Sequence, residues 1–385
     1  MPSPRDLSRR QFLARSAGIA GASIGLGVGA QETSPGGSVV PIRIGFVGLG
    51  DRGTQLLSTI LQLPGVSVAA LVDVNPGHLK RAADLARGHQ PRISADAGSL
   101  FDRRDLDAVV IATPVHLHPE HALRAIDAGK HIFLEKPLGL TAADCLRVHD
   151  AALVAERQGR VFQIGLQRRY SPRYRRSIAA IRNGEAGRVL FIRAQWHSTG
   201  NPARGTKPWY FRREKSGDVV VEQACHQMDI FNWALGGVPL QACGFGGLHH
   251  HIDKPPGRDV RDHYGLVLEY AGGAKVHYSH VSYSVPDRRF SGIYELVFGE
   301  KLGVDLANAV AWDRSGRTVE LTRDGGNDTL CALAGYLRCI RSGERPEADI
   351  RVACASTLTS LLARKALDAG ATVTWKEMLD SAGPV

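Results

Sequence analysis

A glycine-rich turn between an apolar segment and an amphipathic segment constrains this chain more than any other feature. Residues 41–47 are typical of a short buried strand, Gly48-Leu49-Gly50-Asp51-Arg52-Gly53 follows directly, and a helix is expected over residues 54–63. A GxGxxG segment in this strand–turn–helix setting is the fingerprint of a dinucleotide-binding βαβ unit. The sequence therefore predicts a doubly wound α/β domain that begins near residue 42.

Each glycine of the turn has a separate role in binding a dinucleotide. Gly48 permits the tight turn, Gly50 has no Cβ that would block the pyrophosphate, and Gly53 lets the helix pack closely on the strand. Asp51 and Arg52 lie between Gly50 and Gly53, just before the expected helix, whose N-terminus would face the phosphates. We therefore expect all five residues to line a cofactor site.

An acidic residue ends the next predicted strand. Residues 66–72 are apolar and lead into Asp73, and Asn75 and Pro76 follow without an adjacent Arg or Lys. A carboxylate at this position would accept hydrogen bonds from the ribose diol and repel a 2′-phosphate. The sequence thus favours NAD over NADP.

Strands and helices continue to alternate beyond Asp73. Apolar strands are expected over residues 106–112, 130–134 and 161–164, and a helix over residues 118–128. Ligands of such domains bind at the carboxyl ends of the strands. The cofactor-site candidates that follow these strands are Thr113, Pro114, His118, Glu135 and Lys136.

Three short motifs in this domain resemble a known family. The runs Thr113-Pro114-x-x-x-His118, Ala128-Gly129-Lys130-His131 and Glu135-Lys136-Pro137-Leu138 are similar to those of the Gfo/Idh/MocA oxidoreductases, which include inositol dehydrogenases and glucose–fructose oxidoreductase. The resemblance covers residues 42 to about 375. It implies that Lys136 belongs to the active site and that the protein forms a homodimer or homotetramer through a large sheet.

The position of Lys136 gives the same role a physical basis. It lies at the carboxyl end of a predicted strand, where a bound nicotinamide would be. A Lys ammonium there can donate a hydrogen bond to a substrate hydroxyl and stabilise a developing alkoxide. The sequence is compatible with either the cis or the trans isomer of the Lys136-Pro137 peptide bond.

A second set of candidates lies in residues 217–233, which are expected to form one helix. Glu222 and His226 are four residues apart and would lie on one face, where the carboxylate would raise the pKa of the imidazole and fix its tautomer. His226 could then accept the hydroxyl proton during oxidation. Members of the family usually carry Asp where this chain has Glu222. Asp229, one turn on, is either a supporting partner or a solvated acid.

Further substrate-site candidates rest on weaker patterns. Arg168 and Tyr170 follow the strand that joins the domains, and Trp209 and Tyr210 precede the expected catalytic helix. Aromatic faces with Arg and Tyr donors would suit a polyhydroxylated ring, but each residue is equally compatible with core packing. The run His249-His250-His251 has no supporting ligand spacing, so no metal is expected.

The pattern changes after residue 168. Residues 189–196, 241–246, 264–270, 274–283, 294–298 and 303–312 are typical of strands, several with alternation, and helices are expected over residues 329–341 and 351–369. We predict a Rossmann domain over residues 42–168. A substrate-binding and oligomerisation domain over residues 169–385 would hold a large, open, mostly antiparallel sheet.

The N-terminal residues have the features of a targeting signal. Ser8-Arg9-Arg10-Gln11-Phe12-Leu13 precedes an uncharged, Gly- and Ala-rich run that ends at Val28-Gly29-Ala30. The pattern resembles a twin-arginine (Tat) signal peptide over residues 1–30, followed by a linker over residues 31–41. It implies contact with the Tat machinery, export of the folded protein to the periplasm or another extracytoplasmic compartment, and tightly bound NAD(H).

These observations favour an exported NAD-dependent oxidoreductase that acts on a CH–OH group of a sugar, cyclitol or glycoside. An alternative is a redox-cycling enzyme that cleaves glycosides by oxidation, elimination and re-reduction. A less favoured alternative is a non-enzymatic dinucleotide-dependent sensor. The net charge of +10 is compatible with nucleic acid, but the basic residues match no nucleic-acid-binding motif, and no such partner is expected.

Overall fold

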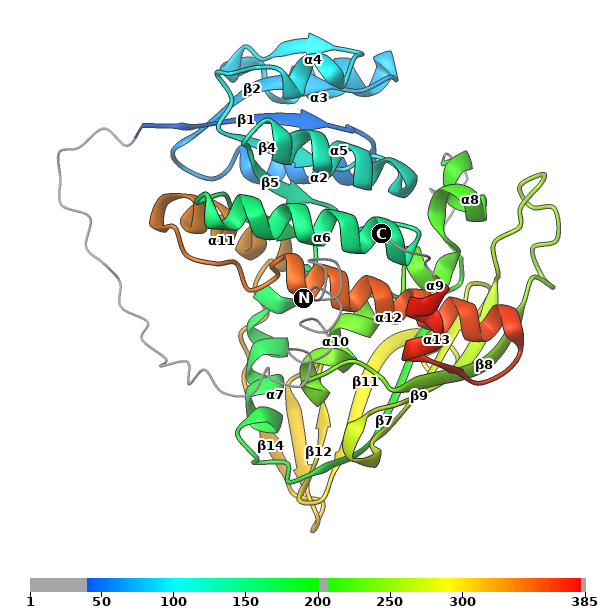
Figure 1. Cartoon of the computed structure of the whole chain (residues 1–385). Coiled ribbons are helices and arrows are strands. Elements are labelled where there is room, and N and C mark those ends of the chain that lie inside the picture. The colour runs from blue at the N-terminus through cyan, green and yellow to red at the C-terminus, as the bar shows by residue number, and fades with distance from the viewer. Residues whose placement is uncertain (1–39, 201–206, 382–385) are drawn as a thin grey trace, which may run out of the picture.

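The computed structural model describes residues 40–200 and 207–381, and within them the chain forms two sheets (Figure 1). The Tat leader and nearly all of the predicted linker lie outside the described residues. Within the described residues no helix is both long and apolar enough to cross a membrane.

The first sheet is parallel, and its strands lie in the order β3-β2-β1-β4-β5-β6. Its strands are nearly continuous apolar runs because helices cover both of its faces. The strands are β1 (Ile42–Val47), β2 (Val66–Val72), β3 (Arg92–Ser94), β4 (Ala108–Ile111), β5 (His131–Leu134) and β6 (Phe162–Ile164). The helices are α2 (Asp51–Ile60), α3 (Pro76–Leu85), α4 (Gly98–Phe101), α5 (His118–Asp127) and α6 (Ala142–Arg157).

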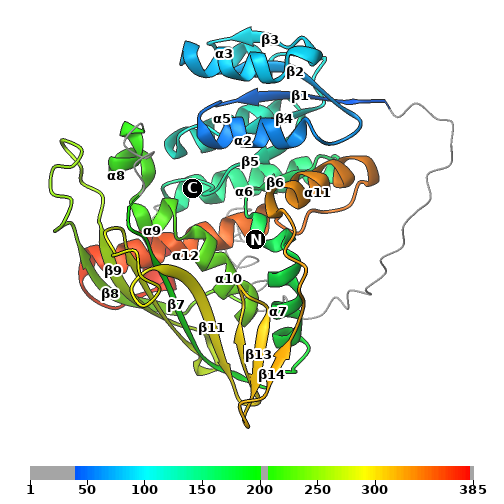
Figure 2. The ribbon, with the colours of Figure 1, turned by 180° about the vertical axis from the view of Figure 1, so that it is seen from behind.

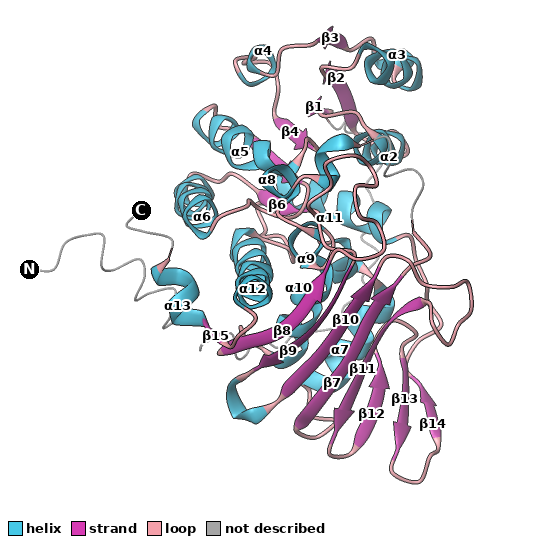
Figure 3. Cartoon of the chain, turned by 90° about the vertical axis from the view of Figure 1, so that its right-hand side faces the viewer, coloured by secondary structure: helices cyan, strands magenta, loops and turns pink. Residues whose placement is uncertain are grey.

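The second sheet runs in the order β14-β13-β12-β11-β7-β10-β9-β8-β15, and its neighbours are antiparallel except for β7 and β10. Figure 3 shows helices on one side of this sheet only. Its strands are β7 (Val189–His197), β8 (Gln241–Gly247), β9 (His263–Glu269), β10 (Lys275–Val281), β11 (Gly292–Gly299), β12 (Leu302–Asp305), β13 (Val310–Asp313), β14 (Thr318–Glu320) and β15 (Val373–Thr374).

The remaining helices lie between the two sheets or beside them. They are α7 (Pro172–Arg182), α8 (Arg213–Ser216), α9 (Val219–Glu222), α10 (Cys225–Leu235), α11 (Asp328–Ser342), α12 (Ile350–Ala369) and α13 (Trp375–Asp380). The predicted fold class, a Rossmann domain followed by a domain with a mostly antiparallel sheet, is confirmed.

Helix α11 returns from the end of the chain to the first domain. Leu333, Tyr336 and Leu337 of α11 are buried in the same apolar cluster as Phe46 and Leu57. Figure 2 shows α11 beside α6 and β6. The domain boundary near residue 168 stays a prediction. The structure adds that α11, although it follows this boundary in the chain, packs against the first domain.

Two element predictions need correction. Residues 303–312, expected as one strand, form the antiparallel pair β12 and β13, with a turn between them. Residues 217–233, expected as one helix, form α9 and α10, which are separated by Gln223 and Ala224. The second correction changes the candidate site.

Candidate functional site

The glycine turn has the geometry that a dinucleotide needs. Gly48 has φ +85°, and a Cβ there would lie 2.6 Å from the Ala112 carbonyl. A Cβ on Gly53 would lie 1.9 Å from the Gly48 oxygen, so only glycine lets α2 start so close to the turn. Around Gly50 the nearest atom to such a Cβ is 3.8 Å away, on His78. The turn is therefore tight at two glycines and open at Gly50, where a pyrophosphate would lie at the N-terminus of α2.

Asp73 is buried at the end of β2 and holds the turn in place. Its carboxylate accepts hydrogen bonds from the amides of Leu49 (2.6 Å) and Asn75 (2.7 Å). The Nδ1 of His78 lies 3.2 Å from the same carboxylate, and no described Lys or Arg pairs with it. The carboxylate thus has lone pairs left for a ribose diol, as the preference for NAD requires.

Arg52 and Glu135 join α2 to the end of β5. Arg52 Nε donates to Glu135 Oε1 at 2.7 Å, and Arg52 Nη1 donates to Thr329 Oγ1 at 3.2 Å. Asp51 forms an ion pair with Lys207 at 2.9 Å. The side chains of Asp51, Arg52 and Glu135 are therefore engaged with protein groups at the rim of the turn. Direct contact between them and the cofactor stays a prediction.

His118 is buried between two strand ends. Its Nδ1 lies 2.7 Å from the Pro137 carbonyl and its Nε2 lies 2.9 Å from the Thr113 carbonyl. Burial lowers the pKa of His118, and a neutral imidazole has one N–H to donate to these two oxygens. His118 thus holds the loops after β4 and β5 together, a positioning role beside the cofactor contact predicted for it. Thr113 Oγ1 lies 3.2 Å from His121 Nδ1.

Lys136 reaches from the end of β5 to α9. Its Nζ donates to the Glu222 carbonyl at 2.6 Å and lies 3.0 Å from Glu222 Oε1. The Lys136-Pro137 peptide bond is cis. An ammonium has three protons, and these two contacts leave one for a substrate oxygen. Lys136 is therefore held in place as a charged hydrogen-bond donor.

The expected pairing of Glu222 with His226 is corrected by the structure. Glu222 ends α9 and its carboxylate pairs with Lys136, whereas His226 lies in the first turn of α10. The pKa of His226 is not raised but lies well below its usual value, because the imidazole is buried and Lys136, Arg168 and Arg52 are nearby cations. His226 is consequently neutral near pH 7, the form that can accept a proton.

The imidazole of His226 retains an open hydrogen-bonding group. Its Nδ1 is buried and has no hydrogen-bond partner among the described residues. A buried polar atom of this kind is costly unless a ligand or water satisfies it. Together, Lys136 and His226 offer a fixed donor and a neutral acceptor at the carboxyl edge of the first sheet.

Two arginines next to the site form buried ion pairs. Arg168 donates to Glu295 at 2.9 Å, and its charge is one of those that act on His226. Arg169 binds Asp229 through Nε and Nη2, at 2.7 Å for the shorter contact, and lies over the ring of Trp233. Burial raises the pKa of Asp229 while Arg169 opposes the rise. Asp229 is thus a buried partner of Arg169, and the solvated alternative is wrong.

The aromatic substrate candidates are only partly supported. Tyr170 is buried, packs against Gly335 and accepts a hydrogen bond from the Ala348 amide, so it is a core residue. Tyr210 is also buried, and its hydroxyl donates to Gln223. Substrate contact by either residue stays a prediction. Trp209 is half-buried and meets the ring of Tyr210 edge-on.

Sequence reasoning missed Asp218, which fixes the start of α9. Asp218 is fully buried, has φ +84° and accepts a hydrogen bond from the Val219 amide at 2.7 Å. Its carboxylate also binds the guanidinium of Arg261, 43 residues away. No local pattern links these two residues, so the sequence carries no signal of the pair.

The three adjacent histidines serve a structural purpose. The backbone amides of His249, His250 and His251 donate to the buried carboxylate of Asp262. Across residues 40–200 and 207–381, no group of three His, Cys, Asp or Glu residues is arranged to hold a metal ion.

Comparisons with known proteins match both domains. The description "oxidoreductase family, NAD-binding Rossmann fold" of the Gfo/Idh/MocA group matches residues 42–166, and "GFO/IDH/MocA C-terminal domain" matches residues 174–303. Inositol 2-dehydrogenase 2 of Saccharopolyspora erythraea is 31% identical over 61% of this chain and 65% of its own length. Inositol 2-dehydrogenase of Acidothermus cellulolyticus is 33% identical over 50% of this chain and 53% of its own. The chain thus spans about half to two thirds of these relatives.

Solved structures share the fold over nearly their whole length. Levoglucosan dehydrogenase in complex with NADH and levoglucosan has a TM-score of 0.74 at 21% identity, and the match covers 87% of this chain and 99% of that one. Scyllo-inositol dehydrogenase from Lactobacillus casei with NAD(H) and scyllo-inositol has a TM-score of 0.71 at 18% identity, with the same coverage. At these identities the likeness establishes a common architecture.

Proposed function

The chain belongs to the Gfo/Idh/MocA oxidoreductase family, and from this premise we propose that it uses NAD(H) to oxidise or reduce one CH–OH group of a sugar, cyclitol or glycoside. One observation carries the proposal. The ammonium of Lys136 is fixed by Glu222, close enough to the neutral imidazole of His226 to lower its pKa, at the carboxyl edge of the NAD-binding sheet.

His226 and Lys136 have different roles at the reacting hydroxyl. In the oxidation direction His226 accepts the hydroxyl proton, because its lowered pKa keeps the imidazole neutral. Lys136 donates a hydrogen bond to the same oxygen and stabilises negative charge as it develops. Bound NAD⁺ supplies the hydride acceptor. Glu222 holds the ammonium in position and balances its charge.

Alanine variants test these roles. We expect Lys136→Ala and His226→Ala each to retain NAD and lose turnover by about 10²–10⁴-fold, the usual effect of removing a general base or a charge-stabilising donor. Turnover is measured by NADH absorbance with a panel of sugars and cyclitols, and NAD binding by calorimetry. Lys80→Ala, an exposed lysine on α3, is the matched control. Normal turnover in either variant would remove that residue from the mechanism, and loss of NAD binding would mean a structural role.

We also propose that the protein is exported with its cofactor. The basis is the twin-arginine leader, because Tat substrates cross the membrane folded. Arg9→Lys together with Arg10→Lys should leave a folded, NAD-loaded protein in the cytoplasm. The wild-type protein outside the cytoplasm should begin near Gln31 and release nearly one nicotinamide per chain on denaturation, as determined by mass spectrometry. Exported protein without nucleotide would contradict cofactor retention, and export of the double variant would contradict the leader assignment.

A further inference from the structure

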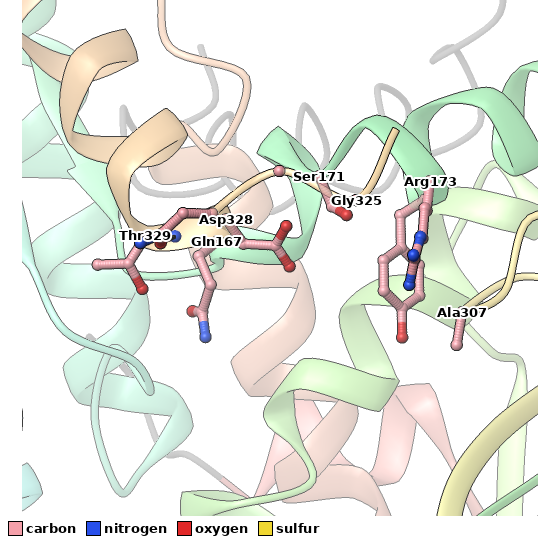
Figure 4. A pocket seen from close by; sticks show the side chains of 10 residues that line it. Gln167, Ser171, Arg173, Ala307, Gly325, Asp328 and Thr329 are labelled. Atoms are coloured by element: carbon pink, nitrogen blue, oxygen red, sulfur yellow. Dashed lines mark hydrogen bonds between the residues drawn. The ribbon is translucent and has the colours of Figure 1, made fainter. Parts of the chain in front are cut away.

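A pocket of about 350 Å³ lies beside the site just described and has no part in the proposed chemistry. It is bounded by the start of α7, the start of α11 and the loop before α11, and its walls include Gln167, Ser171, Arg173, Tyr174 and Asp328. Figure 4 shows Gln167, Asp328 and Thr329 on one side and Arg173 and Ala307 on the other. Its volume is at the lower end of the range for small-molecule pockets, about 300–1,000 Å³.

One edge of the pocket adjoins the catalytic groups. Thr329, which lines it, accepts a hydrogen bond from Arg52, and Gln167 precedes Arg168 in the chain. Arg52 also donates to Glu135, the residue before Lys136. Arg168 and Gln227, the residue after His226, both donate to Glu295. The other edge of the pocket is formed by Arg173, Ala307 and Gly325 (Figure 4). A ligand that occupies the pocket would thus lie next to the residues that surround the catalytic groups.

The polar groups of the pocket suit hydroxyl groups. Gln167 Oε1 is buried without a hydrogen-bond partner among the described residues, and the charge of Arg173 acts on Asp328 across the pocket. Asp328 bonds to Ser171 and is only partly exposed. A buried acceptor, a guanidinium and a carboxylate can together bind several hydroxyls, each of which both donates and accepts.

The charges of the pocket argue against an anionic ligand. The N-terminus of α11 is already capped by Asn327, whose side chain accepts from Thr329 and Leu330. Asp328 adds a negative charge in the same turn, which offsets the positive charge of Arg173. An uncharged polyhydroxylated ring is not repelled by either charge of the pocket, whereas a phosphate or carboxylate would face Asp328.

We propose that this pocket is a second subsite, which binds the second ring of a two-ring glycoside or disaccharide while the first ring reacts at Lys136 and His226. The inference rests on the proposed function and narrows its substrate class. The substrate is then recognised in two places. The second ring improves the positioning of the first but takes no part in proton or hydride transfer.

The test compares free sugars with glycosides that carry the same reacting ring. We expect the wild-type enzyme to favour the two-ring substrates in kcat/KM. Asp328→Asn and Arg173→Gln should each lower kcat/KM for these substrates by about tenfold, the size expected when a hydrogen bond to a charged group is lost. For the free sugars, kcat/KM should change less than about twofold, because both side chains lie outside the catalytic groups. Glu344→Gln, an exposed carboxylate beyond the other end of α11, is the matched control.

The outcomes separate this inference from the function on which it rests. Equal losses on both substrate classes, or no loss on either, would overturn the second subsite while leaving the dehydrogenase intact. A wild-type enzyme that oxidises free sugars but does not prefer any glycoside would overturn it as well. Failure to oxidise either class with bound NAD would instead overturn the proposed function. Melting temperatures of the variants show whether each is folded.

Discussion

Asp73 has two roles, recognition of the cofactor ribose and support of the glycine turn, and the sequence motif describes only the first. The motif assigns its carboxylate to the ribose, and the structure also makes it the acceptor for the amide of Leu49 inside the glycine turn. A substitution at Asp73 therefore changes both cofactor recognition and the rigidity of the turn. Asn75, its near neighbour, accepts hydrogen bonds from Gly77 and His78 at the start of α3.

Because Asp73 has both roles, a change at this position should affect both cofactor preference and stability. Asp73→Ser with Asn75→Arg should shift relative affinity from NAD toward NADP, because the repelling carboxylate is replaced by a cation near the 2′-phosphate. The same variant should lose stability by about 0.5–2 kcal/mol, because the cap of α3 is removed. Affinities are measured by calorimetry and stability by urea unfolding. Asp73→Asn, which removes the charge alone, should weaken NAD without gaining NADP. A wild type that binds NADP as tightly as NAD would contradict the role given to Asp73.

Single residues were predictable from sequence where the chemistry is local. Gly48 and Gly53 lie within six positions of each other, and Lys136 lies in one short motif. The surroundings of His226 were not predictable in this way, since its neighbours Arg52, Lys136 and Arg168 come from three distant segments. The sequence therefore identified the imidazole but gave the wrong direction for its pKa.

At the scale of elements, the break between α9 and α10 creates the lysine site. In a continuous helix the Glu222 carbonyl would accept from the amide of His226, four residues on. Here it accepts from Lys136 Nζ instead. The apolar spacing of residues 217–233 predicts a helix but does not reveal this break. The start of α9 is fixed by Asp218, whose buried carboxylate is held by Arg261 from the loop before β9.

The accuracy of the strand predictions also has a physical reason. Five strands of the first sheet, β1, β2, β4, β5 and β6, were found within one or two residues, because each lies in a mostly apolar segment. The turn between β12 and β13 was missed because residues 306–309 contain no Gly or Pro. Ala309 adopts φ +54° in this turn, a backbone conformation that its residue type does not predict.

At the scale of the whole molecule, the second sheet has one covered face and one open face (Figure 3). The open face carries Phe298 of β11 and Trp312 of β13, which are 44% and 39% exposed and lie on either side of Gly303 of β12, with which both are in register. Phe191 packs beside Phe298, and Phe245 is 74% exposed farther along the sheet. Large apolar side chains that are exposed on an open sheet face are typical of a protein interface. We propose that this face joins the subunits of a homodimer or homotetramer.

Charges placed on this face should separate the subunits. Phe298→Glu with Trp312→Glu would bury two carboxylates in the interface, a cost large enough to dissociate it. We expect light scattering after size-exclusion chromatography to give a dimer or tetramer for the wild type and a monomer for the double variant. Val154→Glu, an equally exposed apolar side chain on α6, should leave the assembly unchanged. Circular dichroism should give the same helix content for all three proteins, because Phe298 and Trp312 lie outside both apolar cores. A monomeric wild type, or a double variant that keeps the wild-type mass, would refute this face as the subunit contact.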